Sequence, residues 1–600
     1  MIKAAIDIDL YVIGPFITQS SEPGPWGLDA CLMRNGDGRP IIPGTHIAGK
    51  LRQALEELNS AFDSGSHSQV PGQMEINRLL GGEAWGETLN SRPKQLLFDD
   101  FVMLGETPGY AIRYRIRMDP SRGAAQDQAQ LMLESPFPSG EKICFVGRIE
   151  FLASDKQEAK RVFNLIETGF QWFTQMGAWH SQGFGRVSNV NLGGPIITEP
   201  DTEVITGIEA LDLVIKPRAP FCVDAATPAD NLFRSGEIIS GSTLLGCLFE
   251  MLGGEANRNK EDGYQALREN FSLLRVRHAF PTPNDKTRPV AMPLSLVKTD
   301  MGTYDVAGLE KPCLIDGKAP KFKPDWKDDG PREDYGWPEL KRELRTRTRI
   351  DSEQLRAADN DLFSLDMIRP SGCFWLTSID AGAVPEADRP AVLEQLQRLL
   401  SLGLMGLGKT KTRAHVKVHK PGHIQPVHDS RPMLQNNGMT TITLQTDALL
   451  LPPGMLNEAS GESELKTAYR KIWNELSAHL ELKWYYARQA LRGGEFLSRR
   501  YQRAGAAYYP WIITLAGSVF VFEVKDKAGA QAKLEKWLRA GLPLPESVCT
   551  GYNIRDNGPD QWRDCPYVPQ NGWGEIAVNL SVHPAPSDTT PIELIEEASS

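Results

Sequence analysis

The chain repeats itself, and this feature limits the folds open to it more than any other. Two segments, one starting at Arg115 and one at Arg347, both carry an Arg-x-Arg-x string before an aspartate. An acidic residue follows each aspartate 15 positions later and a glycine follows it 21 positions later. These positions are Asp119, Glu134 and Gly140 in the first copy and Asp351, Asp366 and Gly372 in the second. An internal repeat of this length indicates a fold assembled from similar units.

The flanking segments repeat as well. Upstream lie IIPGTHIAGKLRQALEEL, from Ile41, and IISGSTLLGCLFEML, from Ile238. Downstream, each copy has an apolar strand-like run, an amphipathic helix and a glycine-rich turn, the turns covering 177–192 and 403–419. The order strand, helix, strands, helix, glycine loop, strand is that of a ferredoxin-like (RRM-like) βαββαβ unit. We therefore predict an α+β protein of tandem ferredoxin-like domains with insertions.

The predicted domains follow from this repeat. The first unit covers 1–200 and the second 205–425, with a Pro-rich insertion at about 280–343. A degenerate third unit covers 438–585: it keeps the order of helices and strands, with one strand expected at 511–524, but has no PGTHIAGKL segment. The last stretch, 586–600, is acidic and poor in large apolar groups, so we predict a disordered tail. A length of 600 residues accommodates three such units at roughly 150 residues per domain.

Composition excludes several classes of protein. The formal net charge is −10, so any nucleic-acid surface must be a local basic patch. The eight cysteines are scattered without a CxxC pair, which argues against a zinc ribbon and a disulfide framework. No apolar run approaches the ~20 residues of a membrane span, and the N-terminus lacks the pattern of a signal peptide. We expect a cytoplasmic protein without membrane partners.

The glycine loops are candidate phosphate-binding segments, because glycine lets backbone N–H groups approach a phosphate closely. Their candidate residues are Gly183, Gly185 and Arg186 in the first unit and Gly406, Gly408, Lys409, Lys411 and Arg413 in the second. The alternative for each loop is a tight turn between a helix and a strand. GLGKT lacks the spacing of a P-loop, so we reject nucleotide hydrolysis.

Three side chains in the first unit could act on a phosphodiester. Asp29 lies in a Gly/Pro-rich loop, where a carboxylate could hold a divalent metal or orient a 2′-hydroxyl. His46 stands at a helix start and His180 in the first glycine loop, so the pair could serve as acid and base if loop and helix meet. The alternatives are a solvated aspartate or Asx turn and ordinary polar surface histidines.

Two further segments combine cations with a regular pattern. Arg345, Arg347 and Arg349 alternate, which places them on one face of a strand. The stretch 484–511 interleaves Trp and Tyr with five arginines, as a surface that stacks single-stranded RNA would. An amphipathic helix followed by a solvated loop explains this second stretch equally well.

With these motifs in place, the chain resembles the RAMP superfamily of CRISPR-associated proteins, and in particular the backbone subunit of type III effector complexes. The resemblance runs through WGLDACLMRNGDGRPIIPGTHIAGKLR, RIRMDPSRGAA, LESPFPSG and GAWHSQGFGRV in the first unit. ISGSTLLG and LAGSVFVFEV in the later units are similar to the more divergent two-unit RAMP protein of type III-D systems.

The resemblance implies a subunit that binds a guide CRISPR RNA and, through Asp29 and a divalent metal such as Mg²⁺ or Mn²⁺, cleaves a single-stranded target RNA. It implies antiviral defence together with other effector subunits. It also adds residues of the IPG helix to the RNA-binding set, which then includes Thr45, His46, Lys50, Arg52 and His180 besides the glycine loops. Asp224 and Asp230 lie in the corresponding loop of the second unit, but their spacing departs from the family pattern, which leaves a second cleavage site open.

Three functions therefore remain under consideration. The first is a guide-binding endoribonuclease subunit that acts through Asp29. The second is an architectural subunit that binds RNA and cuts nothing. The third is a metal-independent nuclease that matures guide precursors with His46 and His180.

Overall fold

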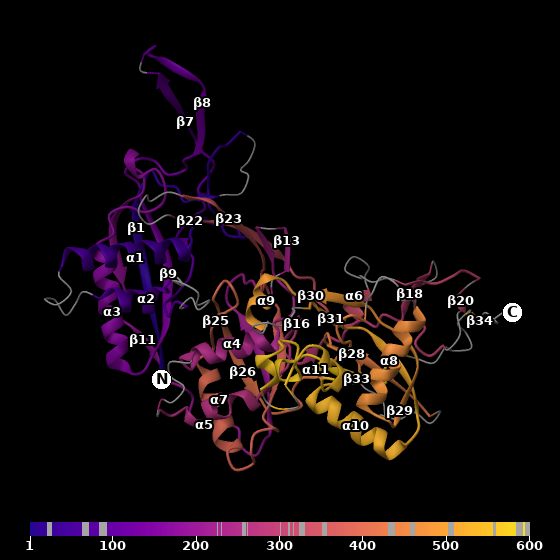
Figure 1. The fold of residues 1–600 in the computed structure, drawn as a ribbon. Coiled ribbons are helices and arrows are strands. Elements are labelled where there is room, and N and C mark those ends of the chain that lie inside the picture. The colour runs from indigo at the N-terminus through magenta and orange to yellow at the C-terminus, as the bar shows by residue number, and fades with distance from the viewer. Residues whose placement is uncertain are drawn as a thin grey trace.

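A computed structural model gives the fold of the chain (Figure 1). The structure describes all residues except 21–26, 63–70, 83–92, 120, 225, 230, 255–259, 261, 300–301, 310–312, 316, 323–330, 351–356, 430–437, 456–461, 502–508, 556–557, 559, 584–591 and 595–600. The predicted mixed α+β class is confirmed, since helices cover three principal antiparallel sheets. Each sheet lies within one of the three predicted units.

The sheet of the first unit is built around β1 (Ile2–Ile13). This strand alternates apolar and polar residues and pairs along its whole length with β9 (Lys142–Ala153). The strand order is β10-β1-β9-β6-β4, with β10 at Arg186–Leu192, β6 at Phe101–Met103 and β4 at Ile41–Ile42. β5 (Leu97–Phe98) pairs with β9 and β11 (Ile196–Thr198) with β1. The helices are α1 (Gly44–Ala61), α2 (Gln73–Leu80) and α3 (Lys156–Gln171).

The second unit repeats this arrangement. Its sheet has the order β15-β24-β12-β26-β25. β12 therefore lies between β24 and β26, just as β1 lies between β9 and β10. The strands are β12 (Ala210–Pro217), β15 (Arg275–Val276), β16 (Phe280–Thr282), β24 (Phe374–Asp380), β25 (Leu404–Leu407) and β26 (Thr412–His419). The helices are α4 (Gly241–Met251), α5 (Gln265–Glu269) and α7 (Arg389–Ser401).

The third unit has a four-stranded sheet of order β29-β32-β28-β33. The strands are β28 (Met439–Leu444), β29 (Leu480–Tyr486), β32 (Val519–Val524) and β33 (Ile576–Val578). The helices are α8 (Glu462–Leu476), α9 (Glu495–Tyr501), α10 (Lys527–Ala540) and α11 (Glu546–Gly551). The predicted single strand over 511–524 is wrong. Gly517, with a φ of 83°, turns the chain, so that β31 (Trp511–Thr514) pairs with β30 (Gln489–Arg492) and β32 joins the main sheet.

The repeated Gly at the start of α1 and α4 has a common physical cause. A Cβ on Gly44 would lie 2.6 Å from the Asp99 carbonyl oxygen, and one on Gly241 would lie 2.0 Å from the Val276 carbonyl oxygen. Each helix therefore begins against the backbone of a neighbouring strand, which only glycine permits. Thus the IPG and ISG motifs mark the same packing contact in both units.

The repeated Arg-x-Arg segments form the first strands of two long hairpins. In the first unit, β7 (Ile112–Asp119) pairs with β8 (Ala124–Glu134), and this hairpin projects from the body of the molecule (Figure 1). In the second unit, β22 (Arg342–Ile350) pairs with β23 (Ala357–Ile368). β14 (Leu232–Arg234) joins this second hairpin in parallel with β23 and pairs with β13 (Ala226–Ala229).

The Pro-rich insertion contains short strands and connects the second unit to the third. Its strands are β17 (Thr287–Arg288), β18 (Leu296–Thr299), β19 (Gly302–Asp305), β20 (Cys313–Ile315) and β21 (Lys321–Phe322), followed by α6 (Pro331–Asp334). The Trp484 indole donates to the Ala307 carbonyl at 3.0 Å, which ties the insertion to β29. β34 (Ile592–Leu594) pairs with β20, so the predicted disorder of the tail is wrong for these three residues.

Candidate nucleic-acid interface

Asp29 lies at the root of the β7–β8 hairpin. Its carboxylate accepts the Met132 N–H at 2.7 Å, and its own N–H donates to the Met132 carbonyl at 2.9 Å. The side chain is exposed, and among the described residues its second carboxylate oxygen has no protein partner. The loop therefore presents one oriented carboxylate to solvent.

Glu134 fixes the segment that follows Asp29. Its side chain is fully buried and forms a bidentate ion pair with Arg34, one of whose bonds measures 3.0 Å. The same carboxylate accepts the Leu32 N–H at 2.8 Å. A buried carboxylate needs such partners because its desolvation is costly. The acidic residue of the repeat thus locks β3 (Cys31–Leu32) against the end of β8.

His46 and the first glycine loop do meet. The Gly177 N–H donates to His46 Nε2 at 3.3 Å. Burial, Lys50 and His180 together lower the pKa of His46 to about 4. Burial and Lys50 also lower the pKa of His180, whose Nε2 is buried without a hydrogen-bond partner. Both imidazoles are therefore neutral at pH 7.

The hairpin arginines lie over the aromatic rings of this glycine loop. The Arg115 guanidinium lies 5.0 Å from the ring centre of Trp179, and that of Arg113 lies 5.4 Å from the ring of Phe184. Trp179 has a φ of 65°, a conformation that few non-glycine residues adopt. Our predicted site residues did not include these two arginines, although their alternation with Ile112, Tyr114 and Ile116 along β7 placed them on one face.

The other predicted residues of the first unit differ in accessibility. Thr45, Gly183 and Arg186 are exposed or open to solvent. Gly185 has a φ of 69°, and a Cβ there would lie 1.8 Å from the Met176 carbonyl oxygen, so its role is to close the turn. Lys50 is half-buried and donates to Gln53 at 3.1 Å.

Arg52, which is also in the predicted RNA-binding set, makes its contacts within the first unit. Its guanidinium donates to Asn77 at 3.1 Å and to the Gly81 carbonyl, and it pairs with Glu56 at 3.3 Å. These contacts hold α1 against the end of α2. The side chain serves helix packing because its donors are already occupied.

In the second glycine loop, some predicted residues pack against the protein and others are accessible. A Cβ on Gly408 would lie 2.4 Å from the Cys222 carbonyl oxygen, and the Lys409 N–H donates to that oxygen at 2.9 Å. Gly406 has a φ of 98°. Arg413 is buried: it donates to the Leu97 carbonyl at 2.9 Å and pairs with Asp99. Arg413 therefore joins the second unit to the first, and its assignment to RNA binding stays a prediction.

Asp224 caps a helix. Its carboxylate accepts the Ser240 N–H at 2.8 Å, the Ser240 hydroxyl at 2.7 Å and the Thr243 hydroxyl at 2.9 Å. These bonds satisfy the start of α4 and leave little capacity for a substrate. Asp230 and Asp351 lie outside the described residues, as does the side chain of Arg349.

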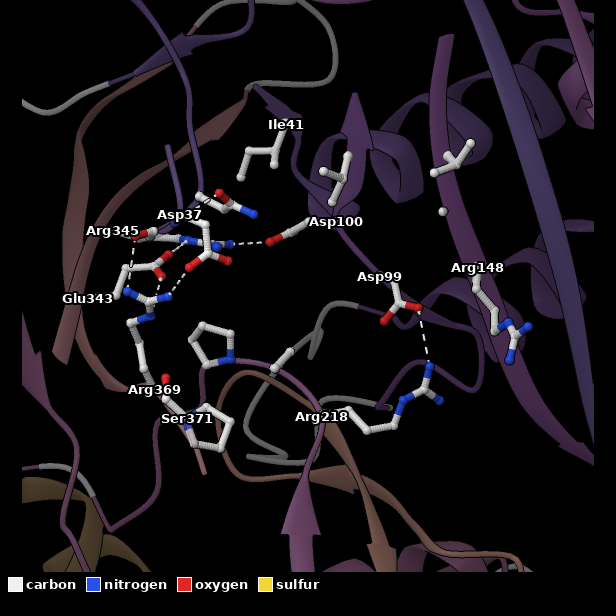
Figure 2. Close-up of a pocket in the computed structure, with 18 of the residues that line it drawn as sticks. Asp37, Ile41, Asp99, Asp100, Arg148, Arg218, Glu343, Arg345, Arg369 and Ser371 are labelled. Atoms are coloured by element: carbon white, nitrogen blue, oxygen red, sulfur yellow. Dashed lines mark hydrogen bonds and ion pairs between the residues drawn. The ribbon is translucent and has the colours of Figure 1, made fainter. Parts of the chain in front are cut away.

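A cavity of about 710 Å³ lies between the first and second units, and Figure 2 shows the charged side chains that line it. Arg369 bonds Asp37 at 2.7 Å and the Gly36 carbonyl at 3.1 Å. Arg345 bonds Asp100 at 2.5 Å and Glu343 at 2.6 Å. Asp100 in turn accepts the Gly44 N–H at 2.9 Å. This chain of ion pairs couples the β22–β23 hairpin to the loop after Asp29 and to the start of α1.

The aromatic stretch 484–511 contributes to packing. Tyr485 contacts the Tyr469 ring in the core of the third unit, with ring centres 5.0 Å apart. The Tyr486 hydroxyl donates to the Val306 carbonyl at 3.0 Å. These two rings contact protein, and residues 502–508 lie outside the described residues, so both interpretations of the stretch stay open.

The donors available to a divalent metal are few. No group of three His, Cys, Asp or Glu side chains able to hold a metal occurs among the residues that the structure describes. Asp29 offers a single carboxylate oxygen. Mg²⁺ is often bound by one or two carboxylates together with water and substrate phosphates, so Asp29 fits a site that RNA completes. Within the described part of the chain, no helix is both long and apolar enough to span a bilayer.

Comparison with known protein families finds one match within the first unit. Residues 31–188 match the family model described as the RAMP superfamily. The matched segment covers β3, the hairpin, the first glycine loop and the start of β10. Asp29 lies two positions before the matched segment.

Chains of many solved structures also match, and two of them are described here. One is a chain of the cryo-EM structure of the Type III-B Cmr-beta bound to cognate target RNA, with 14% identity and a TM-score of 0.24 over 32% of this chain and 60% of that one. The other is a chain of the same complex bound to cognate target RNA and AMPPnP, with 12% identity and a TM-score of 0.27 over 52% of this chain and 86% of that one. This chain thus spans about 60% of the length of the first. A comparison with curated proteins finds no match.

Proposed function

We propose that this protein is an RNA-binding RAMP subunit of a type III CRISPR effector complex and that its first unit cleaves target RNA through Asp29. One observation carries the proposal: Asp29 is held by Met132 at the root of a hairpin whose arginines lie over the glycine loop. The β7–β8 hairpin thus has a carboxylate bonded at its root and two cations that lie over the glycine loop.

The residues divide the chemistry between them. Met132 orients the Asp29 carboxylate, whose second oxygen is available to accept a proton from a 2′-hydroxyl or to bind a metal. Arg113 and Arg115 lie where they can neutralise backbone phosphates. A divalent metal bound at Asp29 would supply Lewis-acid assistance to the scissile phosphate.

We further propose that the three units, 1–200, 205–425 and 438–585, are tandem ferredoxin-like RAMP domains that clasp a guide RNA. The strand orders support this, because β1 lies between β9 and β10, β12 between β24 and β26, and β28 between β32 and β33. Target RNA and the other effector subunits are the remaining proposed partners.

The metal-independent alternative is weaker on chemical grounds. His46 and His180 lie close together, but both pKa values are lowered and His46 already accepts a hydrogen bond from Gly177. A pair of neutral imidazoles lacks the general acid that such cleavage needs.

The test is Asp29→Ala in the complex assembled with guide and target RNA. We expect loss of cleavage at the position served by this unit and unchanged RNA binding, with Asp201→Asn, in the exposed linker, as a control that cleaves normally. Unchanged cleavage at every position would contradict the catalytic role. Cleavage that persists in EDTA and disappears with His180→Ala would favour the metal-independent nuclease. If the wild-type complex binds RNA but cleaves none with any divalent metal tested, the protein is an architectural subunit.

A further inference from the structure

Residues 94–100 of the first unit form a seam with the second unit. Arg413 donates to the Leu97 carbonyl at 2.9 Å and pairs with Asp99, while Arg345 pairs with Asp100 at 2.5 Å. These contacts bring the start of β26 and the root of the β22–β23 hairpin to the same short segment. The side chains beside them therefore gather at one place, although they come from three parts of the sequence.

Three more cations surround this seam. Lys94 stands three positions before Leu97, Arg347 lies on the same face of β22 as Arg345, and Lys411 precedes Arg413 by two positions. Among the described residues, none of the three has an ion pair or a hydrogen bond to a carboxylate. Burial lowers the pKa of Lys94 to about 8, and the nearby charges of Arg347, Arg413 and Lys411 add to this.

The nearby carboxylates are already occupied. Asp100 bonds Arg345 and the Gly44 N–H, and Asp99 bonds Arg413 and faces Arg218 at 3.7 Å. Lys411 also holds a φ of 52°, a conformation that lysine rarely adopts. Cations without a carboxylate partner in a half-buried seam repel one another, so an anion that joins them reduces this repulsion.

We propose that Lys94, Arg347 and Lys411 form a phosphate-binding site that takes a backbone phosphate of single-stranded RNA as the strand passes from the first unit to the second. The inference rests on the proposed RNA binding and adds a site that neither unit contains alone. The open glycine turns of both units allow a strand to continue on either side, since Gly183 has free space around it and a Cβ on Gly406 would meet only the Lys411 side chain, at 3.7 Å.

Binding of a fluorescently labelled single-stranded RNA to the full chain tests the site. We expect Lys94→Gln, Arg347→Gln and Lys411→Gln each to weaken binding roughly five- to tenfold and to reduce the slope of log K against log salt by about 0.7. Lys536→Gln, which removes an exposed cation on α10, is the matched control and should change neither quantity.

The pattern of results separates this site from the proposed function. If Arg115→Gln weakens RNA binding while the three seam variants bind like the wild type, the seam site is wrong and the RNA-binding function stands. If the wild-type chain binds no RNA, the proposed function itself fails.

Amine-reactive labelling at pH 8 with mass spectrometry gives a second readout that does not depend on a substitution. RNA should protect Lys94 and Lys411 from labelling at least about threefold and leave Lys536 unchanged, because a bound phosphate covers the two amines. Inorganic phosphate at the same ionic strength should protect them little. Equal protection by phosphate alone would overturn the assignment of the site to an RNA strand.

Discussion

Buried polar side chains decide the local shape of the interface at the scale of single residues. Glu134 has no exposed side-chain surface and satisfies its charge with Arg34 and the Leu32 N–H. His46 accepts the Gly177 N–H and so joins α1 to the glycine loop. Each side chain connects segments distant in sequence, which keeps the Asp29 loop and the glycine loop in place beside the hairpin.

His46 makes the stability of the first unit depend on pH. The unfolded chain protonates this imidazole near pH 6.5, whereas the folded chain does so only near pH 4. The contribution of His46 to the free energy of unfolding is therefore fully present above pH 6.5. On the order of 2–3 kcal/mol of it is lost as the pH falls from 6.5 to 4. Urea unfolding at pH 7.5 and pH 5 should show a smaller difference for His46→Gln than for the wild type. An equal difference in both proteins would contradict the prediction.

At the scale of elements, the β7–β8 hairpin separates two kinds of side chain. Ile112, Tyr114, Ile116 and Met118 are all about half exposed, with values from 49% to 61%. The arginines alternate with them and point to the opposite face, because successive residues of a strand point to opposite faces. One face of the hairpin therefore carries charge toward the glycine loop while the other exposes apolar surface.

The charged face leads to a prediction about RNA affinity. The double substitution Arg113→Gln with Arg115→Gln should weaken binding of single-stranded RNA roughly tenfold or more and lower the salt slope by about 1.4, since two phosphate contacts are lost. Fluorescence anisotropy over a salt series measures both quantities. Arg161→Gln, on α3 and 50% exposed, is the control for charge and should leave the affinity unchanged. An unaltered salt slope in the double variant would show that these arginines do not contact the RNA backbone.

At the scale of the whole molecule, buried ion pairs join the units. Arg413, Arg218, Asp99 and Glu150 connect the first two. Glu575 connects the second and third: burial raises its pKa, but Arg288 and Arg277 outweigh this and lower it to about 2. The insertion is also hydrogen-bonded to the third unit. Asp305 bonds His583 Nδ1 at 2.7 Å, and His583 Nε2 bonds the Thr443 hydroxyl at 2.9 Å.

Arg413 should control how firmly the first two units are joined. Arg413→Leu leaves Asp99 and the buried Glu150 facing only Arg218, and removing one partner of a buried pair costs roughly 3 kcal/mol or more. We expect faster cleavage of the linker at Glu203 by a glutamate-specific protease, by at least about tenfold. Arg398→Leu, which removes an exposed pair with Glu394 one helical turn away, should cleave at the wild-type rate. Equal rates for both variants would show that this pair does not hold the units together.

The sequence by itself determined the repeat, the order of elements and the places of the main helices, because these follow from local periodicity and from glycines that a neighbouring backbone requires. It also singled out Asp29 and His180 in loops and His46 at a helix start as candidate polar residues. Only the tertiary structure decided which charges are available. Arg413, Arg52 and Asp224 have the same local context as ligand-binding residues, yet packing between distant segments occupies them. Lys94 carries no local motif, and it gains its setting beside Arg347 from a contact between two units.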